Sequence, residues 1–371
     1  MKNVLIIHQS AELYGSDKTL LTFLKKVDRK LINPVVILPK SGPLKDVLDD
    51  LKIIVFILPV LKLYRNIFTP FGITKFIKEY NVVAKKLKEL HKHFQFQTVY
   101  SNTLAVLAGA FFAKKESIKH VWHVHEIIKH PKIIAAIFPK LLKKYATVII
   151  CNSKATESNI LYHIPALESR IKVIYNGVND IWDSPQTEKT PSNPMIVTLI
   201  GRISRLKGHK WAINALEPLL KTNQIKLLFV GSPVPNQEYY LEEVNALIQS
   251  KNLCNQINII PFINDLSSIW HQTDLALMPS TEAESFGLVA AEAMLASKPV
   301  IATNLGGLKE VVKNNETGLL IPVYDNEAFL KSVTVFLENP SLIQQMGTKG
   351  RVHVLSQFSV QEFVKEVQDT L

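Results

Sequence analysis

Two glutamates, Glu284 and Glu292, stand on either side of a predicted change from loop to helix. The helix is expected to begin near Phe286 or Gly287, after a buried strand and a polar loop, with Ser285 as its N-cap. The free N–H groups of a first helical turn attract anions, and a glycine there lets a ligand approach the backbone closely. The two carboxylates can accept hydrogen bonds from a sugar ring and from a ribose, with phosphate groups between them.

Isolated from their surroundings, Glu284 would be a solvated loop residue and Glu292 a surface helix residue. Glu292, however, lies within the apolar run Leu288–Leu295, where an unpaired carboxylate would be costly. The surroundings therefore favour a binding role for this glutamate.

A second group of candidates lies in residues 201–208, Gly-Arg-Ile-Ser-Arg-Leu-Lys-Gly, between a predicted strand and a predicted helix. The guanidinium of Arg202 offers a planar fork to phosphate oxygens, and the ammonium of Lys207 adds a point charge. Together they could neutralise a nucleoside diphosphate leaving group without a metal ion. Arg205 is given no role, and the alternative for the segment is a solvated basic loop.

The N-terminal half holds further candidates. His125 and Glu126 follow a strand predicted at Val121–Val124, and ligands of open α/β sheets bind beyond the carboxyl ends of the strands. His123 is expected to point to the opposite face of that strand and to be structural. The loop after the first predicted strand contains Gly15, whose backbone can approach a diphosphate, and three candidates for contact with an acceptor, Ser16, Asp17 and Lys18. Glu126 is a further candidate for contact with the acceptor.

The elements that must position these residues alternate along the chain. Short apolar runs typical of buried strands are separated by helical patterns, which predicts parallel sheets with crossover helices. The predicted strands are Val4–His8, Pro34–Leu38, Ile53–Leu58, Thr98–Ser101, Val121–Val124, Thr147–Cys151, Ile196–Ile200, Lys226–Val230, Ile257–Ile260, Leu275–Pro279 and Val300–Thr303, and the predicted helices include Thr19–Val27, Ile73–Phe94, Trp211–Leu220 and Glu238–Ser250.

A polar, proline-rich stretch divides this pattern into two similar halves. We expect an α/β chain with an N-terminal domain at residues 1–180, a linker at 181–194 and a C-terminal domain at 195–353. A C-terminal helix at residues 354–371 is expected to join the first domain. Two Rossmann-like domains facing each other would create a cleft lined by their strand ends.

The chain of 371 residues is 47% hydrophobic and 20% charged, which is typical of a globular protein. Two cysteines without metal-ligand spacing, and the absence of a signal peptide or an apolar run of about 18 residues, indicate a cytoplasmic protein. The net charge is +11, and residues 1–180 carry 28 of the 43 basic residues but 13 of the 32 acidic ones. A basic N-terminal half favours an anionic partner, although a lysine-rich solvated surface is the simpler explanation.

Several familiar motifs are absent. The chain has no G-x-G-x-x-G opening a helix, no G-x-x-x-x-G-K-[ST], no Asp-x-Asp and no His/Cys cluster with metal spacing. We therefore expect neither a dinucleotide cofactor nor a protein-held metal.

The central segment strongly resembles the E-x7-E signature of the retaining GT-B glycosyltransferases of family 4. The basic segment Gly-Arg-x-x-x-x-Lys-Gly resembles the phosphate-clamping loop of the same family, and His125-Glu126 resembles its His-Asp or His-Glu pair. The resemblance extends over nearly the whole chain and is strongest at residues 196–320. The residues that agree with the signature are Glu284, Phe286, Gly287, Glu292, Ala293 and Met294.

The resemblance implies a role for each candidate. Glu284 would contact hydroxyls of the donor sugar, Glu292 would hold the ribose, and Arg202 with Lys207 would bind the diphosphate. His125 would meet the exocyclic hydroxyl of the sugar, with Glu126 in support. The backbone from Ser285 and Phe286 through Gly287, Leu288 and Val289 would meet the sugar and the phosphates.

The first loop departs from the family pattern, because the family often has two glycines where this chain has Tyr14-Gly15. The resemblance implies metal-independent transfer with retention of configuration, by a front-face route in which the leaving phosphate helps to deprotonate the acceptor. UDP is favoured over GDP in the donor. The basic half suggests a glycan or polyprenyl-linked glycan acceptor of lipopolysaccharide or capsule assembly, at the inner face of a membrane. Candidate docking segments are Ile73–Phe94 and Lys132–Tyr145, although core packing explains many of the same apolar positions.

Several alternatives stay open. Within the same fold, a GDP-mannose-dependent mannosyltransferase and a sugar-nucleotide epimerase are the nearest enzymes, and the epimerase would lack both motifs. An NAD-dependent oxidoreductase fits the α/β pattern but not the loops. From other classes, a non-catalytic sugar-nucleotide or glycolipid binder is an alternative, whereas a nucleic-acid-binding protein would need aromatic residues among the lysines or a reading helix.

Overall fold

The structure is a computed structural model, and it describes residues 1–63, 69–182, 191–234 and 236–371. Contacts divide the chain into two units, Met1–Gly177 with Val360–Leu371, and Val178–Ser359. These units are called the first and the second domain below. Residues 183–190 of the predicted linker lie outside the described part of the chain.

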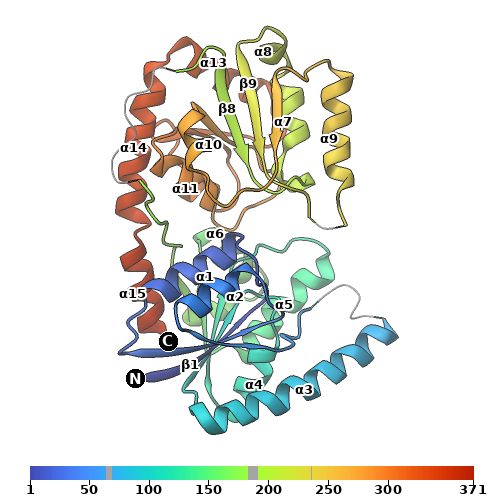
Figure 1. The fold of residues 1–371 in the computed structure, drawn as a ribbon, viewed down its shortest axis with the longest axis vertical. Helices are drawn as coiled ribbons and strands as arrows, with labels where there is room; N and C mark the ends of the chain where they lie inside the picture. The colour runs from blue at the N-terminus through green and yellow to red at the C-terminus, as the bar shows by residue number, and fades with distance from the viewer. Residues whose placement is uncertain (64–68, 183–190, 235) are drawn as a thin grey trace. The chain divides into compact units, whose positions relative to one another are not determined.

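The first domain is built on a parallel sheet of seven strands in the order β3-β2-β1-β4-β5-β6-β7 (Figure 1). Parallel strands covered on both faces consist of nearly continuous apolar runs, as Val4–Ile7 of β1 illustrates. The strands are β1 (Lys2–His8), β2 (Ile32–Leu38), β3 (Ile54–Ile57), β4 (Thr98–Asn102), β5 (Lys119–Val124), β6 (Val148–Cys151) and β7 (Ile171–Val173).

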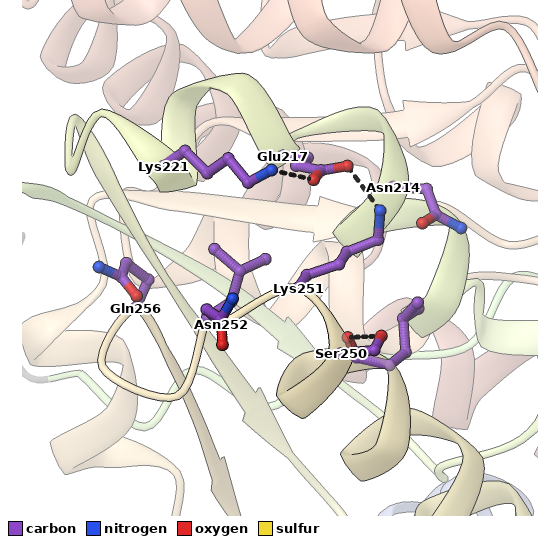
Figure 2. Close-up of a pocket in the computed structure, with 9 residues that line it drawn as sticks. Asn214, Glu217, Lys221, Ser250, Lys251, Asn252 and Gln256 are labelled. Atoms are coloured by element: carbon purple, nitrogen blue, oxygen red, sulfur yellow. Dashed lines mark hydrogen bonds and ion pairs between the residues drawn. The ribbon is translucent and has the colours of Figure 1, made fainter.

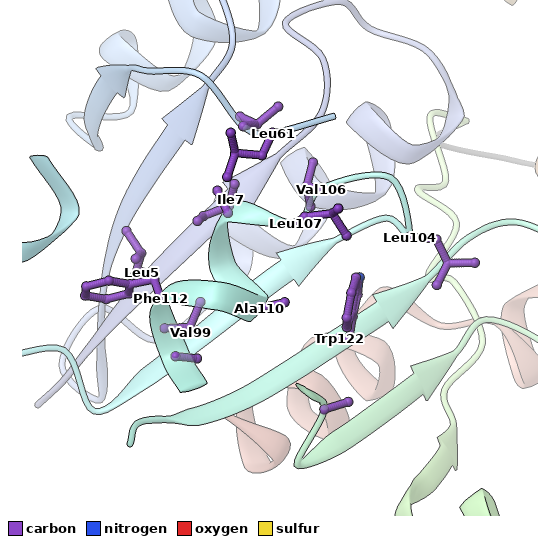
Figure 3. Packing of buried hydrophobic residues seen from close by; sticks show 14 of the residues in the cluster. Leu5, Ile7, Leu61, Val99, Leu104, Val106, Leu107, Ala110, Phe112 and Trp122 are labelled. Atoms are coloured by element: carbon purple, nitrogen blue, oxygen red, sulfur yellow. The ribbon is translucent and has the colours of Figure 1, made fainter. Parts of the chain in front are cut away.

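Helices cover both faces of this sheet, because successive side chains of a strand point in opposite directions. Leu5 and Ile7 belong to the core under α3, α4 and α5 (Figure 3), whereas Val4 and Ile6 belong to the core under α1, α2 and α15. The helices are α1 (Gly15–Lys26), α2 (Pro43–Asp50), α3 (Pro70–Phe94), α4 (Ala108–Glu116), α5 (Lys132–Tyr145), α6 (Lys154–His163) and α15 (Val360–Thr370).

The chain's C-terminal segment differs from the single helix predicted at residues 354–371. Helix α14 (Ser341–Gln357) belongs to the second domain, and a new helix, α15, starts at Val360 and packs against α1. Phe358 ends α14 because its backbone leaves the helical region, and its ring packs edge-on against Phe286 at a centroid distance of 5.3 Å. Only the residues from Val360 onward therefore join the first domain.

The second domain repeats the architecture with six parallel strands in the order β10-β9-β8-β11-β12-β13. The strands are β8 (Met195–Ile200), β9 (Ile225–Val230), β10 (Ile257–Ile260), β11 (Leu275–Met278), β12 (Val300–Thr303) and β13 (Gly318–Ile321). The helices other than α14 are α7 (His209–Ala215), α8 (Glu217–Lys221), α9 (Tyr239–Ser250), α10 (Ser267–Gln272), α11 (Leu288–Leu295), α12 (Leu308–Val311) and α13 (Asn326–Glu338).

The helix predicted at Trp211–Leu220 is in fact two, α7 and α8, which meet at Leu216. Pro218 stands in the first turn of α8, where its missing N–H is tolerated, whereas inside a longer helix it would break a hydrogen bond. No helix in the described ranges is long and apolar enough to cross a membrane.

Both sheets share one feature that positions a site. The order of strands reverses between β1 and β4 in the first domain, and between β8 and β11 in the second. The loops that leave these neighbouring strands diverge to opposite sides of the sheet, which opens a crevice where ligands of such folds bind. All candidate residues follow one of these four strands or the neighbouring β5.

Candidate active site

The loops after β8 and β11 are joined by an ion pair at the switch point of the second domain. The ammonium of Lys207 lies 2.7 Å from Oε1 of Glu284, and the hydroxyl of Ser280 donates to the same oxygen. Both paired side chains are about one quarter exposed or less. Burial would raise the pKa of Glu284, but the charge of Lys207 and the hydrogen bonds from Lys207 and Ser280 outweigh burial and lower it. The pair is thus an ionised, partly desolvated couple.

Further contacts brace the same two loops. The amide of Thr281 donates to the carbonyl of Leu206 at 2.8 Å, and its hydroxyl donates to the carbonyl of Arg205 at 3.1 Å. The guanidinium of Arg205 also pairs with Glu282. Sequence reasoning missed this role of Arg205, and no local signal could have shown it because the partners are 77 residues apart. Arg202 lies exposed on the braced loop.

Gly208 is where the basic loop crosses the end of β11. Its φ is +76°, and a Cβ atom there would lie 2.0 Å from the carbonyl oxygen of Pro279. We expect Gly208→Ala to lower the free energy of unfolding by about 2–4 kcal/mol, because the backbone must shift and remain in a left-handed conformation. Urea unfolding measures this loss. Gly15→Ala is the control, since a Cβ there meets nothing within 4 Å, and an equal loss in that variant would contradict the prediction.

Helix α11 begins one to two residues later than predicted. The predicted N-cap, Ser285, is wrong, because the N-cap is Gly287 with φ +107° and the first helical residue is Leu288. A left-handed backbone at this position favours glycine, and a Cβ there would lie 2.8 Å from the side chain of Leu308. The amides of Leu288 and Val289 form the first turn, where N–H groups have no acceptor within the helix.

One face of α11 carries the predicted ligand contacts. Leu288, Val289 and Glu292 are the partly exposed residues of this helix, and the spacing of three and four places them on the same side. Phe286 is 2% exposed and packs into the domain, so only its backbone can meet a ligand. Glu292 therefore stands one turn beyond the helix start, on the side of its free amides.

Two glycines in the loop after β12 pack closely against the backbone of the Glu284 loop. The amide of Gly307 donates to the carbonyl of Glu284 at 2.7 Å. A Cβ at Gly306 would lie 2.3 Å from that same carbonyl oxygen, and one at Gly307 would lie 2.5 Å from that of Ser285. The backbone that carries Glu284 is thus fixed by close backbone packing.

The first-domain candidates gather beyond the ends of β1, β4 and β5. Nε2 of His125 lies 2.7 Å from Oδ1 of Asn102, and His125 is partly exposed. Burial, followed by the charges of His123 and His8, holds the pKa of His125 well below 6.5. A neutral imidazole therefore stands at the switch point of the first sheet.

The sequence predicted that His123 points to the face opposite His125, but the two side chains lie on the same face of the strand. The two ring centroids lie 4.0 Å apart, because residues two apart on a strand share one face. His123 is fully buried, and its Nδ1 lies 2.6 Å from the hydroxyl of Tyr100. Its expected structural character agrees with this burial, although its expected direction was wrong.

Asp17 is not an accessible acceptor ligand. It is 1% exposed, its Oδ2 accepts the amide of Tyr14 at 2.9 Å, and its Oδ1 lies 2.5 Å from Nε2 of His8. The third position of a helix is where a carboxylate can cap the preceding backbone, which explains its inward direction. Ser16 and Lys18 are partly exposed on either side, and Gly15 is exposed.

Glu126 accepts the amides of Leu104 and His125 at 3.1 and 3.0 Å. Burial raises the pKa of Glu126 from 4.5 to about 7, and these hydrogen bonds offset only part of the rise. A carboxyl group whose pKa is raised in the folded state contributes stability that is complete below 4.5 and is lost as the pH rises to about 7.

Between pH 4.5 and 7, the free energy of unfolding of the wild-type protein should fall by on the order of 2–3 kcal/mol. Glu126→Gln should remove this fall, because the amide keeps its acceptor oxygen and cannot ionise. The measurement is urea unfolding of both proteins across that range. Parallel pH profiles for the two proteins would contradict the raised pKa.

A cavity of about 610 Å³ lies elsewhere in the second domain (Figure 2). Its residues come from the ends of α7, α8 and α9 and from the segment before β10, at the amino edge of the sheet. Its carboxylate, Glu217, is bound by Lys221 at 2.7 Å and by Lys251 at 2.5 Å. This cavity is therefore separate from the loops after β8 and β11. Across the described ranges, no cluster of three His, Cys, Asp or Glu residues has the geometry of a metal site.

Comparison with known proteins gives two successive family matches. The model described as Glycosyltransferase Family 4 matches residues 15–181, and the model described as Glycosyl transferases group 1 matches residues 180–353. The two matched ranges together contain most of both domains and include the positions of the predicted site residues.

Curated relatives are distant. An uncharacterised glycosyltransferase of Methanocaldococcus jannaschii is 25% identical over 231 residues, which are 59% of this chain and 58% of that protein. A D-inositol 3-phosphate glycosyltransferase of Corynebacterium kroppenstedtii is 24% identical over 242 residues, 60% of this chain and 52% of that protein. The matches thus span little more than half the length of these relatives.

Among solved structures, the Anabaena protein HepE, in complex with UDP and glucose, is similar over 100% of this chain and 99% of its own, with a TM-score of 0.83 and 23% identity. This likeness confirms the predicted architecture of two Rossmann-like domains.

Proposed function

The chain belongs to the family 4 glycosyltransferases of the GT-B fold, and we propose that it moves a hexose-type sugar from a UDP-sugar to a hydroxyl of a glycan or lipid-linked glycan, with retention of configuration. The observation that carries the proposal is the Lys207–Glu284 pair at the switch point of the second domain. One member can meet a phosphate and the other a sugar hydroxyl. The complex of HepE with UDP and glucose supports a UDP-sugar donor.

In this proposal, cleavage of the donor leaves negative charge on the diphosphate. Arg202, Lys207 and the first-turn amides of α11 stabilise that charge, and such preorganised electrostatics is the largest contribution in many enzymes. The bracing of the basic loop against Thr281 and Pro279 keeps these groups in place before the donor binds. Glu292, one turn into α11, accepts hydrogen bonds from the ribose.

The carboxylate of Glu284 is engaged by Lys207 and Ser280, so it suits binding of a sugar hydroxyl better than attack on the sugar. We therefore favour a front-face route. The leaving phosphate oxygen takes the proton of the acceptor hydroxyl while the new glycosidic bond forms on the same face. His125 accepts a hydrogen bond from the exocyclic hydroxyl of the donor sugar. The whole reaction needs no metal ion in this scheme.

A donor panel tests the proposal directly. UDP- and GDP-linked hexoses are incubated with the protein, and release of the nucleoside diphosphate is followed with and without glycan acceptors. Turnover of a UDP-hexose is the expected result, with the anomeric configuration of the product read by NMR. Turnover of GDP-mannose alone would favour the mannosyltransferase, and donor binding without turnover would favour a non-catalytic binder.

We also propose that the acceptor is met at an anionic membrane, on the cytoplasmic side. A groove of about 480 Å³ on the first domain is lined by aromatic residues of α3, α4 and α5 and by Lys114 and Lys115. On α3, Phe71 is 81% exposed and Ile77 is 53% exposed. An apolar surface bordered by lysines suits the interface of an acidic bilayer. Such a location is consistent with lipopolysaccharide or capsule assembly.

Vesicle binding checks this location. The protein is expected to co-sediment with phosphatidylglycerol vesicles, to bind phosphatidylcholine vesicles weakly, and to be released by salt. Replacing both Phe71 and Ile77 with serine should weaken binding about tenfold or more, because each apolar side chain contributes roughly 1.5–3 kcal/mol when buried. Val352→Ser, at a position 63% exposed in α14, is the control. Vesicle binding that is insensitive to salt and to acidic lipid would contradict the proposed electrostatic attraction between the lysines and the membrane.

A further inference from the structure

A chain of hydrogen bonds leads from the start of α1 to His125. Oδ1 of Asp17 lies 2.5 Å from Nε2 of His8, and Nδ1 of His8 lies 2.9 Å from Nδ2 of Asn102. Oδ1 of Asn102 lies 2.7 Å from Nε2 of His125. The first three residues are at most 1% exposed, whereas His125 is partly exposed. The hydrogen bonds therefore connect a buried carboxylate to a partly exposed histidine.

The carboxylate gives this chain a direction. An ionised Asp17 can only accept hydrogen bonds, so Nε2 of His8 carries a proton. Nδ1 of His8 lies 2.9 Å from Nδ2 of Asn102, and because an amide NH₂ group only donates, Nδ1 of His8 is the acceptor. The carbonyl oxygen of Asn102 consequently faces His125, and Nε2 of His125 must be the donor. The tautomers of His8 and His125 thus each follow from the preceding partner in this chain of hydrogen bonds.

We propose that Asp17, His8 and Asn102 are positioning residues that hold His125 in its Nε2–H tautomer, so that its Nδ1 accepts a hydrogen bond from a hydroxyl of the donor sugar. This inference rests on the proposed function for the identity of the ligand. The ring of His123, tilted by 37° with its centroid 4.0 Å away, restricts the rotation of the imidazole. Burial keeps His125 neutral, so the lone pair persists at physiological pH.

A fixed lone pair also selects the donor. A sugar with a hydroxyl at this position can donate to Nδ1, whereas a uronic acid would present a carboxylate, which only accepts. The buried chain would then leave two acceptors facing each other, a mismatch that costs more than the loss of one hydrogen bond. The protein should therefore prefer hexosyl donors over their uronic acid counterparts.

Asp17→Asn should reverse the donor and acceptor roles along this chain of hydrogen bonds, because asparagine has nearly the same shape as aspartate but carries an NH₂ group. The amide of Tyr14 donates to Oδ2 of Asp17, so the carbonyl oxygen of the new asparagine must face Tyr14 and its NH₂ group must face His8. His8 would then donate from Nδ1, Asn102 would turn over, and Nε2 of His125 would accept. In the reversed chain, Nδ1 of His125 carries the proton.

Histidine ¹⁵N NMR of the full-length protein, without ligand, reads the tautomers. We expect Nε2–H for His125 in the wild type and Nδ1–H in Asp17→Asn. The double variant Asp17→Asn/Asn102→Asp keeps the total charge and offers a carboxylate to His125, so it should restore Nε2–H. Asp325→Asn, which replaces the cap of α13, is the control for loss of a capping charge. Nδ1–H in the wild type, or an unchanged tautomer in Asp17→Asn, would overturn the proposal.

The donor preference gives a second readout. The ratio of kcat/KM for a hexosyl donor to that for its uronic acid should fall about 10- to 100-fold in Asp17→Asn and recover in the double variant. An unchanged ratio despite a reversed tautomer would refute the proposed selection. Failure of the proposed function is distinguishable, because the protein would then turn over no donor while the NMR result stays readable.

Discussion

Replacing Arg202 and Lys207 together with alanine is expected to lower kcat for sugar transfer at least about a thousandfold while the second domain stays folded. Each cation is proposed to meet charge that develops on the leaving diphosphate, and removing one such donor from an active site commonly costs a factor of 10²–10³. The loss corresponds to at least about 4 kcal/mol of transition-state stabilisation. Steady-state kinetics with the donor found active in the panel measures it.

The same loop provides a matched control for this experiment. Arg205 is exposed and pairs with Glu282, so Arg205→Ala removes one positive charge close to the site without touching the proposed phosphate contacts. Exposed ion pairs contribute roughly 0–1 kcal/mol, and we expect near-normal stability and turnover in this variant. Undiminished turnover in the double variant, or an equal loss in Arg205→Ala, would show that these side chains do not bind the diphosphate.

Glu284→Gln is expected to lower kcat/KM about 100-fold while leaving the affinity for UDP itself nearly unchanged. The amide loses the charge that strengthens a hydrogen bond from a sugar hydroxyl, and it releases Lys207 from its partner. UDP lacks the transferred sugar, so its binding should depend on Lys207 and not on Glu284. Calorimetric titration with UDP, set beside kinetics with the UDP-sugar, separates these two contributions.

Glu282→Gln is the control for this second variant, because it removes the neighbouring carboxylate of the Arg205 pair. It should have kinetics close to those of the wild type. If Glu284→Gln weakened UDP binding as strongly as sugar transfer, Glu284 would act on the phosphates through Lys207, and its proposed contact with the sugar would be wrong.

The pH dependence of stability follows from the same pair. Because Lys207 and Ser280 lower the pKa of Glu284 in the folded state, this carboxylate stabilises the protein above its usual pKa of 4.5. That contribution is lost as the pH falls through the lowered pKa. Glu284 and Glu126 thus have opposite pH dependences, since the first is stabilising when ionised and the second when protonated.

The sequence alone was sufficient for the strands and for the division into two α/β domains. Apolar runs such as Val4–Ile7 predicted buried strands, and their alternation with helical patterns predicted two α/β domains. The basic loop of Arg202 and Lys207, and the glutamates around the start of α11, were recognised by residue type and spacing. These features are local, so neighbouring residues are enough to define them.

Two details could be decided only by the folded chain. The predicted N-cap at Ser285 was wrong because packing against Leu308 favours a left-handed glycine two residues later. Asp17 was expected to face an acceptor, but it turns inward because His8 and the amide of Tyr14 provide buried donors. Such choices depend on partners that local patterns do not reveal.

The sequence by itself thus determined which chemical groups this protein has after its strands: two cations on one loop, two carboxylates around a helix start, and a histidine. Only the tertiary structure decided how they are coupled, with Lys207 paired to Glu284 across 77 residues and Asp17 linked through His8 and Asn102 to His125. The physical reason is the strand order, because β1 lies beside β4 and β8 beside β11. Parallel pairing of strands distant in sequence brings their loops together, and hydrogen bonding between those loops then sets charge and proton position.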